Sequence, residues 1–143
     1  MTLNLPANYE HVVHPKHYNS HPSGVECIDV IEHFSFNLGT AFKYVMRRDD
    51  KGNAKQDINK AIFYIQRNRR AEHITRSLDY VLASLNAIVN TEHNLAANLF
   101  YDHVRSYIVS ATDTDHDHDS PIRVNMLYRL IEESLINLLK TYD

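Results

Sequence analysis

The chain has 143 residues, of which 43% are apolar, and it carries a formal net charge of −3 with a pI near 6.3. This size and composition are typical of one domain with a modest core and argue against general disorder. No run of about 18 apolar residues occurs and the first residues do not resemble a secretion signal, so we expect a soluble, cytoplasmic protein with no membrane partner. The single cysteine, Cys27, excludes an internal disulfide, and we expect it to be buried.

Positive charge is concentrated in one segment of the chain. Nine of the 15 lysines and arginines lie between Lys43 and Arg70, where only three aspartates oppose them, so this segment carries +6 and the remainder about −9. Such asymmetry indicates a phosphate-bearing partner near the basic segment. Nonspecific binding of duplex DNA is disfavoured, because the acidic remainder would oppose the many phosphate contacts that a duplex requires, and specific DNA binding is not expected. A small phosphorylated ligand fits the pattern better.

We expect helices throughout the chain after an irregular N-terminal arm. The first twenty residues are expected to form an extended or irregular arm. Two short helices are expected to follow, at about 25–34 and 38–48. Asn37 is the expected N-cap of the second. All three glycines and three of the four prolines precede residue 53, and residues 53–120 contain neither. Apolar residues in this uninterrupted stretch recur at spacings of three and four, which favours long helices over strands.

Four apolar stripes mark these longer helices. They are Ile58, Ala61, Ile62 and Ile65; Leu78, Leu82, Leu85 and Val89; Leu95, Leu99, Phe100, Val104, Tyr107 and Ile108; and Leu127, Leu130, Ile131, Leu135, Leu138 and Leu139. Ser120 and Pro121 are suited to begin the last helix. Its wide apolar arc fits a core helix and an oligomer interface equally well. The sequence therefore predicts an all-α fold, a compact helical bundle of about five helices with an irregular N-terminal arm, as a single domain over residues 1–143.

The segment from His14 to Tyr18 is dense in polar and ring-bearing side chains. His17 can donate a hydrogen bond to phosphate, and Tyr18 can stack on a base. Composition alone favours the alternative, an ordered surface arm with a packed tyrosine.

A second candidate group lies on the expected helix at 25–34. Spacings of three and four place Glu26, Asp29 and His33 on one face, roughly opposite an apolar face that includes Ile28. Such carboxylates can hold a divalent cation, accept a hydrogen bond from a base or sugar, or act as a general base. A solvated helix face is the more common explanation.

The third candidate group is cationic. Lys43 and Arg47 are four residues apart and project together, which costs a little free energy on an isolated helix and is explained by an anionic partner. Asp57 is expected to pair with Arg47 or Lys60 and so to position the cation that meets phosphate. A solvated charged hairpin is an equally good explanation.

The acidic stretch at 113–119 is similar to the start of a calcium loop, but His118 and Val124 replace the required Gly and Glu. We therefore expect an exposed acidic loop before a helix. The chain contains no GxxxxGK[ST], GxGxxG, HExxH or GxSxG motif, so the usual phosphate-binding loops and hydrolase motifs are absent.

Four segments, taken together and in order, resemble one known phage family. They read HPKHY at 14–18, VECIDVIEHF at 25–34, NLGTAFKYVMRRDDKG at 37–52 and DINKAIFYIQR at 57–67. The combination resembles the small phage nucleotide kinase family, also catalogued as a domain of unknown function and called SaV-like, over about residues 14–70. The resemblance implies a nucleotide-binding segment at 14–70, followed by a helical extension at 71–143 that could form an oligomer interface.

The same resemblance implies an activity and a set of site residues. Members of its kinase-active branch convert deoxynucleoside monophosphates, dTMP and dGMP, to diphosphates without a P-loop, and they form large homo-oligomers. The matching positions with an implied catalytic role are His17, Lys43 and Arg47. The matching positions with an implied role in substrate binding are Tyr18, Glu26, Asp29, Tyr44, Lys51, Asp57, Lys60 and Tyr64.

The leading interpretation is thus a nucleoside monophosphate kinase, because phosphoryl transfer requires mainly positioning and charge neutralisation. No motif requires a cofactor; Mg²⁺ is left open, and no metal ligand is assigned. The first rival is a noncatalytic oligomer that sequesters or senses a nucleotide, such as a host defence signal. A metal-dependent nucleotide pyrophosphohydrolase ranks third, because Asp29 and Glu32 supply only one of the paired acidic motifs it needs. A protein that binds a host enzyme is the remaining class.

Overall fold

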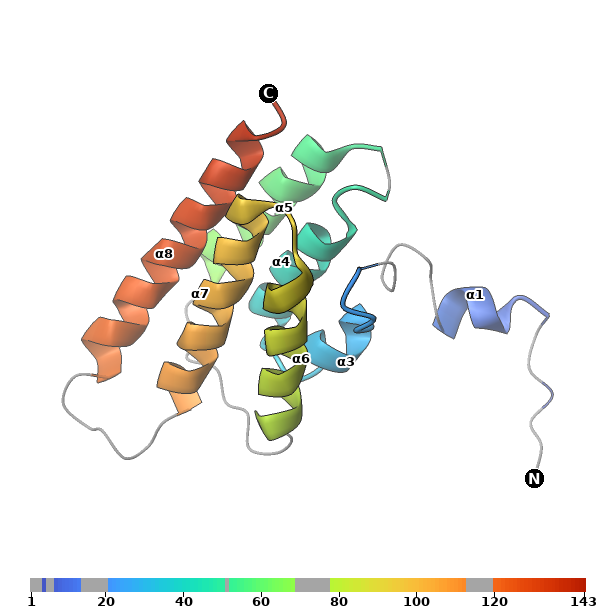
Figure 1. The fold of residues 1–143 in the computed structure, drawn as a ribbon, viewed down its shortest axis with the longest axis horizontal. Helices are drawn as coiled ribbons and strands as arrows, with labels where there is room; N and C mark the ends of the chain where they lie inside the picture. The colour runs from blue at the N-terminus through green and yellow to red at the C-terminus, as the bar shows by residue number, and fades with distance from the viewer. Residues whose placement is uncertain (1–3, 5–6, 14–20, 51, 69–77, 113–119) are drawn as a thin grey trace.

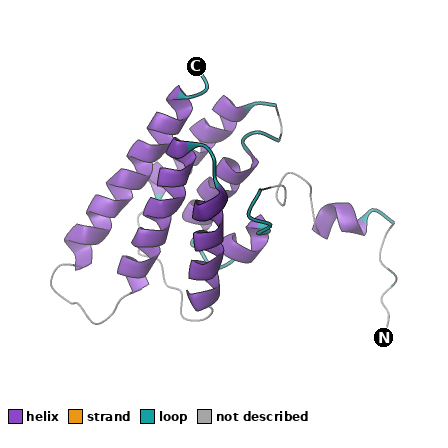
Figure 2. Ribbon diagram, in the orientation of Figure 1, coloured by secondary structure: helices purple, strands orange, loops and turns teal. Residues whose placement is uncertain are grey.

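The protein was obtained as a computed structural model that describes residue 4 and residues 7–13, 21–50, 52–68, 78–112 and 120–143. Within these ranges every regular element is a helix (Figure 2), which confirms the all-α prediction. Two five-residue helices are α1 (Tyr9–Val13) and α3 (Cys27–Ile31). The longer helices are α4 (Phe36–Arg47), α5 (Ala54–Arg67), α6 (Leu78–Thr91), α7 (Leu95–Thr112) and α8 (Ser120–Lys140).

The longer helices pack largely in pairs (Figure 1). α4 lies against α5, and α7 lies against α8, while α5 also contacts α8 and so joins the two pairs. α6 packs on α7, and α3 packs on α4 and α6. Of the described helices, none is long and apolar enough to cross a membrane.

An aromatic cluster fills the centre of the bundle. Phe42 of α4 meets Phe100 and Tyr101 of α7, with ring centres 6.0 and 5.2 Å apart, and all three side chains are fully buried. Cys27 is buried beside this core, as expected. Burial raises the pKa of its thiol to about 12, against the opposing effect of the Lys43 charge.

The predicted stripes are confirmed on α5 and corrected on α7. Ile58, Ala61 and Ile65 are fully buried. Leu95 and Leu99, in contrast, are 74% and 41% exposed. The inward face of α7 is a set spaced at three and four residues, namely Ala97, Phe100, Tyr101, Val104, Tyr107 and Ile108. Leu95 and Leu99 lie outside this set. The prediction placed them on the buried face because they are apolar, and this was wrong.

The start of α4 also differs from expectation. α4 begins two residues early, because Ser35 rather than Asn37 caps it: the Ser35 hydroxyl accepts the backbone N–H of Leu38 at 3.4 Å and donates to Asn68 at 3.1 Å. Asn37 lies within the first turn, and its side chain donates to the carbonyl of Arg67. Both Ser and Asn favour the cap position, so sequence preference did not separate them.

The helix expected at 25–34 is shortened to α3 at both ends. The backbone N–H of Val25 is taken by the Ser23 hydroxyl, and Phe34 already belongs to a turn that bonds back to Ile31. Gly39 lets α3 approach α4 closely, since a Cβ there would lie 3.1 Å from the Ile31 carbonyl oxygen. Before these elements, α1 is a short helix within the arm expected to be irregular, and Asn8, which precedes it, is a favourable cap residue.

A buried guanidinium joins the distant parts of the chain. Arg48, at the end of α4, donates to Glu92 between α6 and α7 at 2.5 Å, to Tyr142 after α8 at 3.1 Å, and to Tyr101 on α7 at 3.5 Å. It also donates to the carbonyl of Val45 at 2.9 Å. We call Arg48, Glu92, Tyr101 and Tyr142 the Arg48 cluster. It ties α4, the α6–α7 corner, α7 and the C-terminal residues together.

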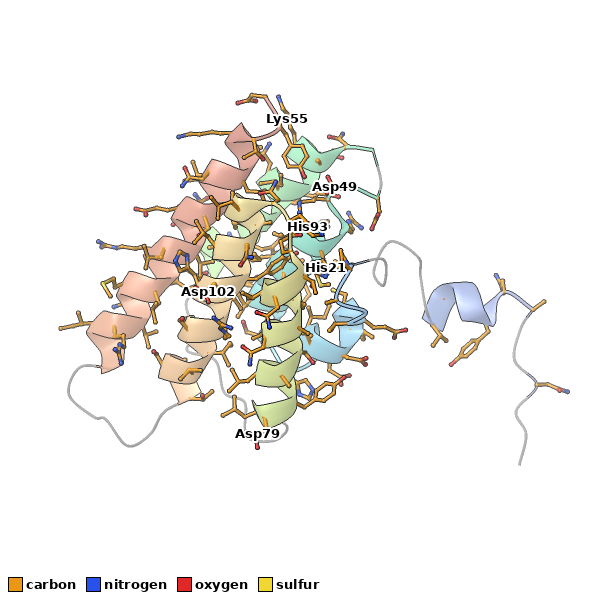
Figure 3. All side chains as sticks on the ribbon, viewed as in Figure 1. His21, Asp49, Lys55, Asp79, His93 and Asp102 are labelled. Atoms are coloured by element: carbon orange, nitrogen blue, oxygen red, sulfur yellow. The ribbon has the colours of Figure 1, made fainter. Side chains whose placement is uncertain are left out.

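Both charges of this cluster are withdrawn from water. The side chains of Arg48 and Glu92 are each 6% exposed. Burial alone would raise the pKa of Glu92, but the adjoining His21 ring and the Arg48 charge outweigh it and hold the pKa below its ordinary value. Figure 3 places His21 and His93 at this corner, and Nε2 of His21 lies 3.6 Å from the Glu92 carboxylate. The carboxylate is therefore ionised in the folded protein and depends on its neighbours for compensation.

We expect Glu92→Gln to lower the free energy of unfolding by about 3–5 kcal/mol, because it removes the buried counter-charge of Arg48 and leaves only the exposed carboxylate of Asp49, at 3.7 Å. Urea denaturation measures this loss. The control is Lys55→Gln, which breaks the exposed pair between Lys55 and Asp143 and should cost less than about 1 kcal/mol. Equal losses in the two variants would contradict a special role for the buried pair.

The contribution of Glu92 should also depend on pH. Because its folded pKa lies below the ordinary 4.5, the stabilisation is complete above that value and is lost as the pH falls through the folded pKa. The stability difference between wild type and Glu92→Gln should thus be full at roughly pH 5 and shrink below roughly pH 4. Urea titrations at several pH values test this, and a difference that stays constant down to roughly pH 3 would argue against it.

Candidate functional site

Helices α4 and α5 form a helical hairpin, and one side of it faces away from the core. Gly52 has a φ of +73°, a conformation that glycine adopts without strain, and Asn53 then caps α5 by accepting the backbone N–H of Gln56 at 3.2 Å. Since Ile58, Ala61 and Ile65 face the core, the opposite side of α5 presents its polar residues outward. This geometry brings the end of α4 beside the start of α5.

Three cations surround one tyrosine ring on this face. The Lys43 ammonium lies 5.1 Å, the Arg47 guanidinium 4.4 Å and the Lys60 ammonium 5.4 Å from the centre of the Tyr44 ring. Each contact gains from the negative face of the ring, but three like charges close together repel one another. An anion placed among them would relieve this repulsion.

One of these cations is held by a buried carboxylate. Arg47 donates to Asp57 at 3.1 Å, and the Asp57 side chain is 4% exposed. This pairing was one of the two predicted for Asp57. Lys43 and Lys60, by contrast, make no ion pair with a carboxylate among the described residues. Asp57 therefore fixes Arg47 in place, while the two lysines carry the positive charge that a ligand would meet.

A shallow pocket of about 560 Å³ adjoins the cations. We call it the Tyr44 pocket; its lining residues are Tyr44, Gln56, Asn59, Lys60, Phe63 and Tyr64. Tyr44 and Tyr64 stack within it, with ring centres 6.1 Å apart and planes inclined by 17°. Aromatic faces, two side-chain amides and an ammonium group thus share one open surface. These are the groups that stack on a flat ring, bind its polar edge and neutralise phosphate.

The structure brings together six of the residues singled out from the sequence. They are Lys43, Tyr44, Arg47, Asp57, Lys60 and Tyr64. His17, Tyr18 and Lys51 lie outside the described residues, as does the acidic loop at 113–119.

The acidic group on α3 lies apart from the pocket. Glu26 precedes α3 and Asp29 lies within it, and neither lines the Tyr44 pocket. The face assigned to Ile28 was wrong: this residue is 52% exposed, because Cys27 and Val30 turn inward instead. Among the described residues, no group of three or more His, Cys, Asp or Glu side chains is arranged to hold a metal ion.

Sequence reasoning missed three lining residues of the pocket. Gln56, Asn59 and Phe63 follow the same spacing of three and four as Lys60 and lie on the outward face of α5. The feature of the sequence that could have pointed to this face is Phe63, a large apolar residue among polar ones. Phe63 is 52% exposed, so it lies on the surface and not in the core.

Comparison with known proteins adds one finding. A family model described as a protein of unknown function, DUF3310, matches residues 12–66. This range contains α3 to α5 almost entirely and includes every residue of the Tyr44 pocket. No curated protein and no solved structure matches the chain. The matched part of the chain is thus the part that carries the cations and the pocket.

We expect Asp57→Ala to lower the free energy of unfolding by about 3 kcal/mol, since it leaves the largely buried Arg47 charge uncompensated. Asp57→Asn should cost less, because the amide oxygen can still accept from Arg47. Denaturation of both variants gives the comparison, with Asp79→Asn on the exposed start of α6 as the control. A loss in Asp57→Ala no larger than the control would show that this pair does not organise the site.

Proposed function

We propose that the chain binds a nucleotide in the Tyr44 pocket, with the phosphate beside Lys43 and Lys60 and the base on the aromatic faces of the pocket. The observation that carries this proposal is the convergence of Lys43, Arg47 and Lys60 on the Tyr44 ring. A pocket of about 560 Å³ suits one nucleotide-sized ligand. Gln56 and Asn59 supply donors and acceptors for the edge of a base.

The activity that we propose first is phosphorylation of a deoxynucleoside monophosphate, dTMP or dGMP, to the diphosphate without a P-loop. Phosphoryl transfer depends on positioning and on neutralising charge, and three clustered cations supply the second of these. Six of the eleven positions matching the phage nucleotide kinases that the sequence resembles lie in or beside this pocket, namely Lys43, Tyr44, Arg47, Asp57, Lys60 and Tyr64. Such an enzyme would act in the cytoplasm of an infected host cell, as a homo-oligomer.

One observation favours the alternative, a noncatalytic protein that sequesters or senses a nucleotide. The carboxylate beside the cations, Asp57, is buried and engaged by Arg47, so among the described residues of the pocket no exposed carboxylate is placed to accept a proton from a substrate. The pyrophosphohydrolase and the host-protein binder rank below these two. The first would need a cluster of carboxylates around a metal ion, and the second would not need a nucleotide pocket.

We expect Lys60→Ala and Lys43→Ala each to weaken dTMP binding by at least about tenfold, because each removes a charge-assisted contact with phosphate. Titration calorimetry with dTMP and dGMP measures the affinity. Lys55→Ala is the matched control, since Lys55 lies on α5 and pairs with Asp143 instead. Unchanged affinity in both Lys43→Ala and Lys60→Ala would overturn the proposed pocket.

The wild type and the same lysine variants distinguish the kinase, the sequestering protein and the pyrophosphohydrolase. Each is incubated with a deoxynucleoside monophosphate and ATP, with and without Mg²⁺, and the products are separated by ion exchange. A diphosphate formed by wild type and by Lys55→Ala, but not by Lys60→Ala, identifies a kinase. Tight binding with unchanged nucleotides identifies the sequestering protein, and hydrolysis of the triphosphate alone to monophosphate and pyrophosphate identifies the pyrophosphohydrolase.

A further inference from the structure

A row of aromatic side chains continues beyond the Tyr44 pocket toward the start of α4. Tyr64 is its centre: it stacks on Tyr44 and makes edge-on contacts with Phe63, at 5.2 Å between ring centres, and with Phe36, at 6.1 Å. Phe36 is 76% exposed and does not line the pocket. We call Tyr44, Tyr64, Phe63 and Phe36 the aromatic row. It extends past the volume that one nucleotide would fill.

Positive charge accompanies the row at both ends. Lys43 and Lys60 lie at the Tyr44 end, and the Arg67 guanidinium lies 5.6 Å from the centre of the Phe63 ring. None of these three cations makes an ion pair with a carboxylate in the part of the chain that the structure describes. A ligand that follows the row would therefore meet cations near Tyr44 and near Phe63, beside two half-buried rings, Tyr44 and Tyr64, and two exposed ones, Phe63 and Phe36.

We propose that the aromatic row binds a single-stranded oligonucleotide, of which the Tyr44 pocket holds one nucleotide; the inference rests on that proposed pocket. Exposed aromatic rings flanked by Lys and Arg are the means by which single strands are bound without strict sequence preference, since every base has a face that stacks. The charge of the row is complementary to a phosphate backbone.

The orientation of the rings separates single strands from duplexes. The Phe63 and Phe36 rings stand at 84° and 78° to the Tyr64 ring, whereas neighbouring bases in a duplex lie parallel. Bases that stack on these rings must therefore be unstacked from one another. A single strand permits this, whereas a duplex keeps its base faces covered. The inference is thus compatible with the weak duplex binding expected from the acidic remainder of the chain.

The test compares four ligands on the folded, full-length protein. They are dTMP, the dinucleotide of thymidine, an oligothymidylate of roughly eight nucleotides, and the same oligonucleotide paired with its complement. Affinities are measured by calorimetry, or by anisotropy of a labelled strand. The variants are Phe36→Ala, Arg67→Ala and Lys60→Ala. Tyr80→Ala is the matched control, because Tyr80 is an aromatic residue on α6 that is 50% exposed.

We expect the oligonucleotide to bind at least about tenfold more tightly than dTMP, and Phe36→Ala to lower its affinity by about tenfold while dTMP affinity stays at the wild-type value. Arg67→Ala should reduce the slope of log K against log salt concentration by about 0.7, the value for one phosphate contact with a single strand. Tyr80→Ala should behave as wild type. Circular dichroism and the unchanged dTMP affinity show that Phe36→Ala is folded.

Three results would overturn the inference: an oligonucleotide bound no more tightly than dTMP, a duplex bound as well as the single strand, or a Phe36→Ala variant indistinguishable from Tyr80→Ala. In each case, dTMP binding that is lost in Lys60→Ala leaves the mononucleotide pocket standing. Conversely, wild type that binds the oligonucleotide through Phe36 but does not bind dTMP would overturn the proposed function and, with it, the placement of one nucleotide of the strand in the Tyr44 pocket. Wild type that binds none of the four ligands would overturn both.

Discussion

The buried charge of Arg48 is the constraint on which the rest of the fold depends. A guanidinium cannot lose its proton to escape an apolar environment, so its burial commits the chain to bringing Glu92, Tyr101 and Tyr142 to it. These partners come from the α6–α7 corner, from α7 and from the residues after α8. A single side chain at the end of α4 thereby fixes how the two pairs of helices meet, and with that the position of the hairpin that carries the Tyr44 pocket.

Helix content and the buried face of α5 were predictable because both follow from local rules. A long stretch without Gly or Pro permits helices, and the spacing of Ile58, Ala61 and Ile65 gives the inward direction. The end of α4 was not predictable in the same way. Arg48 follows Arg47 and precedes Asp49 and Asp50, so by composition it belongs to a solvated charged turn. Its burial results from partners 44 to 94 residues away, which no local pattern records.

In the candidate site, too, some contacts were predictable from the sequence and others were not. The pairing of Arg47 with Asp57 was among those predicted, because the two ends of a tight hairpin must meet. Helical spacing predicted the pairing of Lys43 with Arg47 on one helix, whereas Tyr44 and Lys60 were joined to them by the family resemblance. Glu26 and Asp29 were grouped with them by resemblance alone, and the fold places them on α3, outside the pocket. Phe36 was overlooked because it lies between the two helices expected at 25–34 and 38–48, whereas α4 begins at this residue.

The difference in sequence separation between these contacts has a consequence for the order of folding. The Arg47–Asp57 pair closes a loop of ten residues, whereas the contact between Arg48 and Tyr142 spans 94. Contacts that are close in sequence cost less chain entropy and form sooner than distant ones. The α4–α5 hairpin, with its cations already gathered around Tyr44, is therefore able to assemble while the last helix is still unattached, and the neighbouring Arg48 becomes buried only when the end of the chain arrives.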